Sequence, residues 1–600
     1  MTAGVREQPR GADSPRPRPG TRLRLVGWLT AVAVVAGVGY RLWLLVNAAP
    51  PTNSDEATMG LAALHIARGE GFPVWFYGQQ YMGTLEAYLA APVFALAGGP
   101  SLLGLRLPTL ALYLLFLLLS WRLTLRLTGD RWFGLLVVAL LALGSDRIVK
   151  NQLIAGGGYP EMNAAGVALA ILAVDLAAGR PGWRLARWAA WGFLAGLMLW
   201  VDPLVLPYVV TTGAVLVGFC RRELWGAAGA LLGAAAVLGA APLLLHSLLN
   251  GRNPLHAVLA ASGANATAGW ADRLHGGLLL GPSLGMGFCA PGRCDTWQLW
   301  WALALPLLLA LGAATAWRAL RRPPTEAGPT SPADAASPAD LASPAGPASP
   351  AGPASPAGPA SPAGPASPAG PASLVDPADA GDPVLVAPRV TAAIRLALVL
   401  AAVVTLGAYT VSSSAGLTPV ESSRYLSCLL ISLPALLWPV WTVARRGPRP
   451  SATGRRDLGR TLARPVALAL LAATLGTTAQ ATWRSAQTAP ATRAAEARHA
   501  ELVSTLRQLG VRQVRAGYWT CNRLTFATAE QVVCAVVDDA LRPGFDRYPA
   551  YRREVDRAAA PAWVAPAGSP LANALDERQR ANPGALDLVT IDGWRIYLPR

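Results

Sequence analysis

Two adjacent acidic residues, Asp55 and Glu56, stand directly after an apolar run that is long enough to cross a bilayer. The run covers residues 25–46. A carboxylate can take the proton of a hydroxyl nucleophile, so Asp55 is the first candidate for a general base. Glu56 could assist that base, bind an acceptor, or be a solvated residue near a helix start. Ser54 or Asp55 could also cap a helix, a role that is compatible with catalysis.

Three further charged residues stand at the ends of apolar segments, where each could face a ligand. Lys150, the only lysine, could contact a phosphate, although an interfacial charge that reaches the headgroups is the simpler explanation. Asp202 precedes Pro203 in a turn between two apolar segments, and it could face a cavity or cap a helix. Arg424 begins another apolar segment and could hold a phosphate.

A glycine run at residues 156–158 comes just before Tyr159 and Glu161. Glycine lets the backbone approach a ligand closely, so both residues are candidates for ligand binding, and a plain tight turn is the alternative. Glu86 could be a second acidic group in the same cavity. A salt bridge from Glu86 to Arg106 would explain it equally well.

The composition indicates a polytopic membrane protein. The 600 residues are 53% hydrophobic and only 14% charged, whereas a soluble chain of this size would carry more charge. The net charge of +17 is concentrated in short segments between apolar runs, and no basic stripe carries interleaved aromatic residues. We therefore expect membrane lipids, and no nucleic acid, as partners.

Apolar runs long enough to form spans predict the element order. The two runs between 187 and 219 are the shortest and meet at Asp202-Pro203. The sequence predicts about eleven transmembrane helices, at 25–46, 101–121, 132–149, 161–179, 187–201, 203–219, 226–249, 298–317, 391–411, 425–444 and 464–483.

Arginine placement predicts the orientation in the plasma membrane. Arginines cluster in the N-terminal tail, in alternate loops, and in the run from Arg445 to Arg464. Cytoplasmic loops carry the excess of basic residues, so the N-terminus is predicted to be cytoplasmic. With eleven spans, Asp55 and the C-terminal region then lie outside.

Composition shifts divide the chain into five predicted regions. Residues 1–24 form a disordered cytoplasmic tail, and 25–322 form an N-terminal transmembrane module with the long external loop 47–100. The proline-rich tandem repeats within 323–388 predict a disordered cytoplasmic linker. Residues 389–483 hold the last transmembrane helices, and 484–600 form a small extracytoplasmic α/β domain.

The terminal domain is predicted from alternating strand-like and helix-like segments. Strands are expected at 511–518, 531–537 and 561–566, helices at 550–559 and 571–580, and a closing hairpin at 586–598 around Asp592-Gly593. Helices are also expected in the first external loop at 61–67 and 85–97. Four cysteines fall outside the membrane, where disulfides persist: Cys289, Cys294, Cys521 and Cys534.

The first external loop resembles one protein family. The sequence is similar to the C-type membrane glycosyltransferase superfamily, close to the branch of the protein O-mannosyltransferases and aminoarabinose transferases. The resemblance covers the N-terminal third well, and beyond it Arg424-Tyr425 opens the tenth span as in many such proteins. The residues that carry it are Ser54-Asp55-Glu56-Ala57, Ala67-Arg68-Gly69, Phe76-Tyr77-Gly78-Gln79-Gln80-Tyr81, Ala91-Pro92 and Leu105-Arg106-Leu107-Pro108.

The resemblance implies a donor and a base. Such enzymes take a sugar from a polyprenyl phosphate, and the acidic residue of the first loop, here Asp55, is the implied catalytic base. The acceptor would be an extracytoplasmic glycan, lipid or protein. One carboxylate and one displacement would invert the anomeric centre. Expected donor- or acceptor-binding residues are Gln79, Tyr81, Glu86, Lys150, Tyr159, Glu161, Asp202, Arg424 and Tyr425.

No cofactor or metal is required by this sequence. It contains no phosphate-binding P-loop, and the acid pair at 55–56 lacks the spaced Asp-x-Asp of metal-dependent relatives. Two other functions stay open. One is a transporter or flippase of envelope glycolipids, although the sequence shows few charges within spans and no paired broken helices. The other is a non-catalytic envelope-assembly protein.

Overall fold

Long apolar helices dominate the computed structural model, which describes residues 19–251, 267–322, 388–445 and 458–600. Within these ranges eight helices are long and apolar enough to cross a membrane, and two bent helix pairs raise the number to ten. The predicted polytopic α-helical fold is confirmed. The predicted span that is not among these ten is the fifth, at 187–201, which corresponds to α8 (Arg184–Val201) and falls short because Arg184 and Arg187 make its first turn polar.

The helices follow the predicted order, with boundaries shifted by a few residues. The long helices are α1 (Pro19–Val46), α4 (Leu102–Thr128), α7 (Tyr159–Ala177), α9 (Leu206–Leu224) after η1 (Pro203–Val205), α15 (Trp300–Arg321) after η3 (Thr296–Leu299), α16 (Pro388–Val411), η5 (Ser423–Ser432) with α19 (Leu433–Arg445), and α20 (Leu458–Ala486). Short helical segments are α13 (Trp270–Leu274), η2 (His275–Leu280), α14 (Gly281–Gly285), α17 (Ser413–Leu417) and α18 (Pro419–Ser422).

Two of the predicted continuous spans are bent. The chain turns by 89° between α5 (Arg131–Ala142) and α6 (Asp146–Leu153), and by 64° between α10 (Ala227–Gly239) and α11 (Ala241–Asn250). Pro242 stands in the first turn of α11, where a proline is tolerated at a helix start but not inside a helix. The structure therefore contains two bent helix pairs that the sequence analysis did not predict.

Two other predicted regions fall largely outside the described residues. The linker at 323–388 does so except for Pro388, with which α16 begins. Residues 1–18 of the predicted tail also lie outside the described residues. Helix α1 begins at Pro19, six residues before the predicted start of the first span, so it includes the basic segment that precedes the apolar run.

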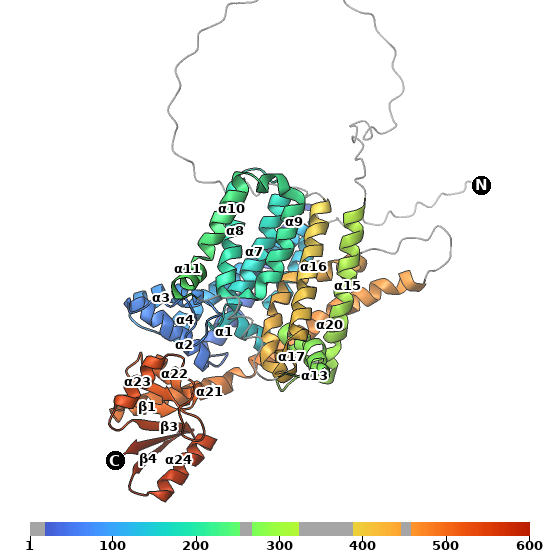
Figure 1. Cartoon of the computed structure of the whole chain (residues 1–600). Coiled ribbons are helices and arrows are strands. Elements are labelled where there is room, and N and C mark those ends of the chain that lie inside the picture. The colour runs from blue at the N-terminus through green and yellow to red at the C-terminus, as the bar shows by residue number, and fades with distance from the viewer. Residues whose placement is uncertain (1–18, 252–266, 323–387, 446–457) are drawn as a thin grey trace, which may run out of the picture. The chain divides into compact units, whose positions relative to one another are not determined.

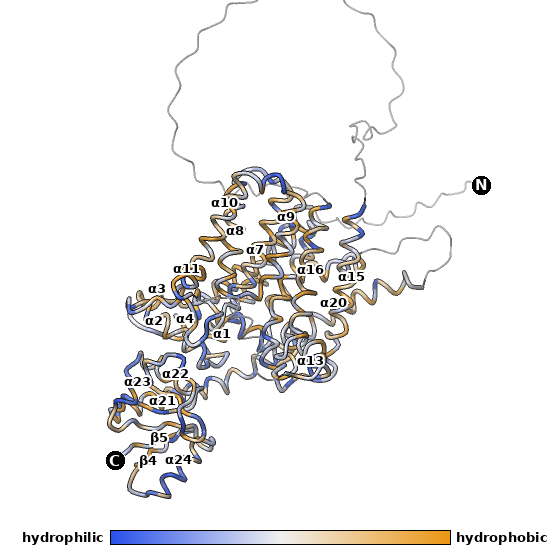
Figure 2. Tube along the Cα trace, viewed as in Figure 1, coloured by the Kyte–Doolittle hydropathy of each residue, from blue (hydrophilic) through white to orange (hydrophobic). Residues whose placement is uncertain are grey.

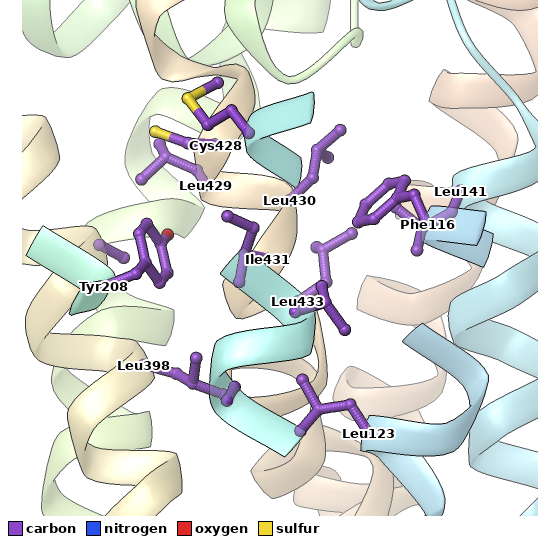
Figure 3. Packing of buried hydrophobic residues seen from close by; sticks show 14 of the residues in the cluster. Phe116, Leu123, Leu141, Tyr208, Leu398, Cys428, Leu429, Leu430, Ile431 and Leu433 are labelled. Carbon is purple, nitrogen blue, oxygen red and sulfur yellow. The ribbon is translucent and has the colours of Figure 1, made fainter. Parts of the chain in front are cut away.

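The transmembrane helices pack around a shared apolar core. Helices α7, α8, α9 and α10 lie side by side (Figure 1), and apolar residues run along these helices (Figure 2). Leu429, Leu430 and Ile431 of η5 are buried against Tyr208 of α9 and Leu398 of α16 (Figure 3). Side chains of η5 thereby fill the space between the surrounding helices.

The loop at 47–100, which is predicted to be external, forms two helices, as predicted. These are α2 (Ser54–Arg68) and α3 (Leu85–Ala97). Asn53 is the N-cap of α2, and its side chain accepts a hydrogen bond from the backbone N–H of Glu56 at 2.8 Å. The expectation that Ser54 or Asp55 caps this helix is therefore wrong. Because Asn53 does so, the Asp55 carboxylate remains free for other contacts.

The C-terminal domain is a mixed five-stranded sheet with helices, as predicted. The strand order is β2-β1-β3-β5-β4, with β1 parallel to both β2 and β3, and β5 antiparallel to both β3 and β4. Its elements are α21 (Ala489–Gln508), β1 (Gln513–Ala516), α22 (Tyr518–Ala527), β2 (Val533–Val536), α23 (Pro549–Arg557), β3 (Ala562–Pro566), α24 (Pro570–Ala581), β4 (Leu586–Ile591) and β5 (Trp594–Pro599).

Two disulfides form from the four cysteines singled out in the sequence. Cys521 of α22 is bonded to Cys534 of β2, and Cys289 is bonded to Cys294 in the segment before α15. The first of these bonds fixes α22 to the sheet. A disulfide in such a short loop restricts the unfolded chain and stabilises the local fold.

Helix α22 packs directly against α2 of the first loop. Ser54 donates a hydrogen bond to the backbone oxygen of Tyr518 at 2.7 Å, and Asn522 donates one to the Ser54 hydroxyl at 2.8 Å. Phe526 belongs to the same buried cluster as Phe94 of α3. The helix that carries Asp55 is therefore held by the C-terminal domain.

A methyl group at position 60 should disturb this contact. A Cβ on Gly60 would lie 2.4 Å from the Phe526 ring, which is too close for real atoms. We expect Gly60→Ala to lower the free energy of unfolding by about 1–3 kcal/mol. Gly39→Ala in α1 is the control, because no atom lies within 4 Å of a Cβ at that position. Thermal unfolding in detergent measures both, and equal melting temperatures would contradict this packing.

Candidate active site

A cavity of about 350 Å³ lies where the first loop, the helix bundle and the C-terminal domain meet. Its lining includes residues from α2, the loop after α2, η1, α16 and η5, together with one residue of the C-terminal domain. Seven of the predicted site residues line it: Asp55, Gln79, Tyr81, Tyr159, Asp202, Arg424 and Tyr425. Segments that lie far apart in the sequence thus meet at one site.

Asp55 occupies the first turn of α2, and its carboxylate reaches the cavity. One oxygen, Oδ1, accepts hydrogen bonds from the Tyr518 hydroxyl at 2.5 Å and from Nη2 of Arg547 at 2.8 Å. The other oxygen, Oδ2, accepts no hydrogen bond from any residue that the structure describes. The positive end of the helix dipole also favours an anion here.

Tyr518 and Arg547 are bonded to each other as well as to Asp55. Nε of Arg547 donates to the Tyr518 hydroxyl at 2.7 Å. Burial, followed by the nearby Asp55 carboxylate, raises the pKa of the Tyr518 phenol, so this group stays protonated and acts as a donor. The Arg547 guanidinium also lies over the Phe76 ring, 4.8 Å from its centroid.

Arg424 supplies a second cation to the cavity. Its guanidinium lies 5.8 Å from the ring centroid of Tyr159 and 5.5 Å from that of Tyr425. Its Nε is buried and has no hydrogen-bond partner among the described residues. The Oε1 atom of Gln79 is buried in the same way. Buried polar atoms are normally paired, so these two atoms are available to bind a polar ligand.

Glu56 and Lys150 do not line the cavity. The Glu56 carboxylate is fully buried and accepts bonds from Nε and Nη2 of Arg106 at 2.6 Å each. Of the alternatives that the sequence left open, a solvated Glu56 is therefore excluded, and so is a salt bridge between Glu86 and Arg106. Lys150 forms an ion pair with Asp146 at 2.9 Å, one turn away on α6.

Glu86 and Glu161 lie in buried positions rather than on the cavity wall. The Glu86 carboxylate accepts backbone N–H bonds from residues 156, 157 and 158 at 3.1–3.3 Å, so the glycine loop folds around this acid. A Cβ on Gly158 would lie 2.8 Å from Val201, and φ is +78° at this position, which explains the glycine. Neither carboxylate oxygen of Glu161 has a partner among the described residues.

Asp202 lies in the turn between α8 and η1, and it has both of the roles considered from the sequence, namely facing a cavity and capping a helix. Its side chain accepts the backbone N–H of Leu204 at 2.8 Å, and it lines the cavity. Burial raises the pKa of this carboxyl to about 7, and burial also raises the pKa of Glu86 to about 7.

These raised pKa values predict a pH-dependent stability. A carboxyl whose folded pKa exceeds its unfolded value stabilises the protein at low pH, and this contribution is lost as the pH rises from about 4 to about 7. We expect Asp202→Asn to reduce the loss of stability between about pH 5 and pH 8 by on the order of 3 kcal/mol. Melting temperatures at the two pH values measure this. Equal pH dependence in wild type and variant would contradict the assignment.

One group of described residues could supply metal ligands, and it lies away from the cavity lining. It consists of His65, Glu70 and Glu530, whose ligand atoms all lie within 4.8 Å of one another. The His65 nitrogens already contact the Tyr77 hydroxyl at 2.7 Å and Glu530 at 2.8 Å. Burial alone would raise the pKa of Glu530, but hydrogen bonds from His65 and Tyr551, with the charge of Arg68, lower it to about 2. This cluster joins α2 to the C-terminal domain.

Sequence reasoning missed both residues that bind Asp55. Tyr518 follows β1 at the carboxyl end of a parallel strand, a place where α/β domains often bind ligands, and this was the available signal. Arg547 lies in the loop before α23, and nothing in the surrounding sequence distinguishes it from the many other arginines.

Comparison with solved structures confirms the fold. The chain is similar to ArnT from Cupriavidus metallidurans bound to undecaprenyl phosphate, with 13% sequence identity, a TM-score of 0.52, and coverage of 97% of this chain and 98% of that one. The apo state of ArnT gives 13% identity, a TM-score of 0.51, and coverage of 96% and 98%. The Archaeoglobus fulgidus oligosaccharyltransferase gives 11% identity and a TM-score of 0.45, covering 90% of this chain and 69% of that one.

Other comparisons give no match. No protein-family model matches the sequence, and no curated protein matches it. The resemblance to the aminoarabinose-transferase branch is thus confirmed at the level of the fold, over nearly the whole length of both chains.

Proposed function

We propose that this protein is a membrane glycosyltransferase that moves a sugar from a polyprenyl phosphate to an acceptor outside the cytoplasm. The transferred sugar would be a hexose or a pentose, and the acceptor a glycan, lipid or protein. The likeness in fold to a transferase crystallised with undecaprenyl phosphate supports this proposal.

The observation that carries the proposal is one cavity that holds a carboxylate with a free oxygen and a cation whose buried Nε has no hydrogen-bond partner among the described residues. The Asp55 carboxylate and the Arg424 guanidinium both line it. A hydroxyl needs a base to become a good nucleophile, and a phosphate leaving group needs a cation to hold its developing charge. The cavity provides both groups, and the lining residues Gln79, Tyr81 and Tyr159 would contact the sugar or the acceptor.

The proposed reaction is a single displacement. The acceptor oxygen forms a bond to the anomeric carbon while its proton passes to Oδ2 of Asp55. The bond from the anomeric carbon to the phosphate oxygen breaks, and the phosphate keeps the electron pair. Asp202 is a poor candidate for a nucleophile, because burial raises the pKa of its carboxyl to about 7 and so disfavours the anion. One base and one displacement give inversion.

The proposed orientation places the cavity outside, with the N-terminus, the linker at 323–388 and its flanking arginines in the cytoplasm. Arginine placement supports it through the positive-inside rule. The disulfides between residues 289 and 294 and between 521 and 534 support the same side for their segments, since such bonds persist in oxidising compartments. We propose the plasma membrane as the location, and a reaction that needs no cofactor or metal.

Binding of the lipid carrier tests the role of Arg424. We expect purified full-length protein to bind undecaprenyl phosphate, and Arg424→Gln to bind it about 10- to 100-fold more weakly, because a charge-assisted hydrogen bond is lost. Arg542→Gln is the control, since that side chain is 76% exposed and pairs with Asp538. Titration followed by native mass spectrometry measures both. Equal affinity in wild type and Arg424→Gln would show that Arg424 does not bind the phosphate, contrary to the proposal.

Sugar transfer tests the function itself. The protein in vesicles would be incubated with radiolabelled undecaprenyl-phosphate arabinose, mannose or glucose and a cell-envelope extract as the source of acceptor. Loss of label from the lipid and its appearance in an acceptor would support the proposal. Because the structure contains two bent helix pairs, the flippase alternative is tested alongside. Movement of intact lipid-linked sugar between leaflets without sugar transfer would overturn the proposed transferase function.

A further inference from the structure

Resting on the proposed function, we infer that the C-terminal domain is part of the active site and that Arg547 and Tyr518 are positioning residues for the Asp55 base. Both side chains bind the same oxygen, Oδ1, and leave Oδ2 to the acceptor hydroxyl. The domain therefore does more than cover the membrane helices. It determines which carboxylate oxygen faces the substrate.

The geometry around Asp55 supports this division between the two oxygens. Arg547, whose side chain is only 8% exposed, also donates to the Tyr518 hydroxyl, so the three groups form a closed triangle of hydrogen bonds. A carboxylate held in this way has little freedom to rotate. Proton transfer depends on placing the base within hydrogen-bond distance, and a misplacement of 1 Å costs about 100-fold in rate.

The contact between α22 and α2 explains why the triangle is rigid. Tyr518 is the first residue of α22, and the buried bonds of Ser54 to the Tyr518 carbonyl oxygen and to Asn522 fix the start of one helix against the start of the other. The disulfide at Cys521 secures α22 one turn later. The residue before Asp55 is thus tied to the same helix that presents Tyr518.

A second anchor lies at the other end of α2. Glu530 receives bonds from His65 at 2.8 Å and from the Tyr551 hydroxyl at 2.7 Å, and it also pairs with Arg68. Two buried anchors, one near each end of the helix, restrict sliding and rotation of α2 against the domain. The position of Asp55 therefore depends on the docked C-terminal domain.

The experiment compares variants of the full-length protein in vesicles, with the undecaprenyl-phosphate sugar that wild type turns over. We expect Arg547→Gln to lower kcat about 100-fold with the donor KM unchanged. Arg547→Lys should recover only part of the rate, because a lysine keeps the charge and loses the planar fork. Tyr518→Phe should lower kcat about 10-fold.

Several outcomes would overturn the inference. One is wild-type kcat in Arg547→Gln while Asp55→Asn is inactive. Another is a raised donor KM with an unchanged kcat in Arg547→Gln, which would make Arg547 a phosphate ligand instead. Should Arg547→Gln fail to fold, wild-type rates in both Arg547→Lys and Tyr518→Phe would overturn it. Wild-type sugar transfer by Asp55→Asn would overturn Asp55 as the base, whereas a wild-type protein that transfers no sugar would overturn the proposed function. Arg542→Gln is the control, because its exposed pair with Asp538 should leave the rate unchanged.

Discussion

Asparagine in place of Asp55 should lower kcat for sugar transfer by about 100- to 10,000-fold, the usual range for loss of a general base. Asparagine has nearly the same shape, so its side-chain oxygen can still accept bonds from Tyr518 and Arg547, which contact Oδ1 in the wild type. Binding of undecaprenyl phosphate should change little, because Arg424 stays in place. Initial rates and native mass spectrometry on the same preparation separate the two effects.

The matched control for this variant is Asp556→Asn. Asp556 also pairs with an arginine, Arg515, at 3.1 Å, but its side chain is 50% exposed and lies on the C-terminal domain away from the cavity lining. We expect wild-type rates from it, since exposed ion pairs contribute little. If Asp55→Asn kept more than about a tenth of the wild-type rate, a general base at this position would be untenable.

The sequence predicts the parts of this site that depend on local order. The acid pair, the aromatic loop and the two loop helices all lie between residues 47 and 100, so the family resemblance over this one segment suffices to name Asp55, Gln79 and Tyr81. Five of the seven predicted residues that line the cavity lie in the first turn of a helix or directly after a helix, where a side chain can point away from the packed helices. The placement of arginines and the length of apolar runs also predict the order of the helices, because each of these features belongs to a single segment of the chain.

The remaining features depend on contacts between distant segments. Arg547 lies 492 residues from Asp55, and its pairing exists only because α22 packs on α2. The identity of the capping residue was missed because Asn53 and Ser54 are both good caps, and only the observed backbone conformation distinguishes them. In the same way, the sequence suggested Glu86 as a partner for Arg106, whereas packing places Glu56 against it.

The buried Glu56–Arg106 pair should contribute strongly to the stability of the fold. Both side chains are 1% exposed or less, and the pair links the first turn of α2 to α4. Removing one partner leaves an uncompensated buried charge, so we expect Glu56→Ala or Arg106→Ala to lower the free energy of unfolding by about 3–5 kcal/mol. Denaturant titration in detergent measures this. A change below about 1 kcal/mol would show that the pair is solvated.

Replacing both partners distinguishes a stability role from a catalytic one. Well-packed apolar residues often substitute for a buried ion pair at no cost, so Glu56→Leu with Arg106→Met should recover most of the stability that either alanine variant loses. If Glu56 only supports the position of α2, this double variant should also recover sugar transfer, whereas a Glu56 that exchanges protons with the acceptor would leave it inactive. Because the Glu56 carboxylate is bonded on both oxygens and does not line the cavity, we expect transfer to return with the stability.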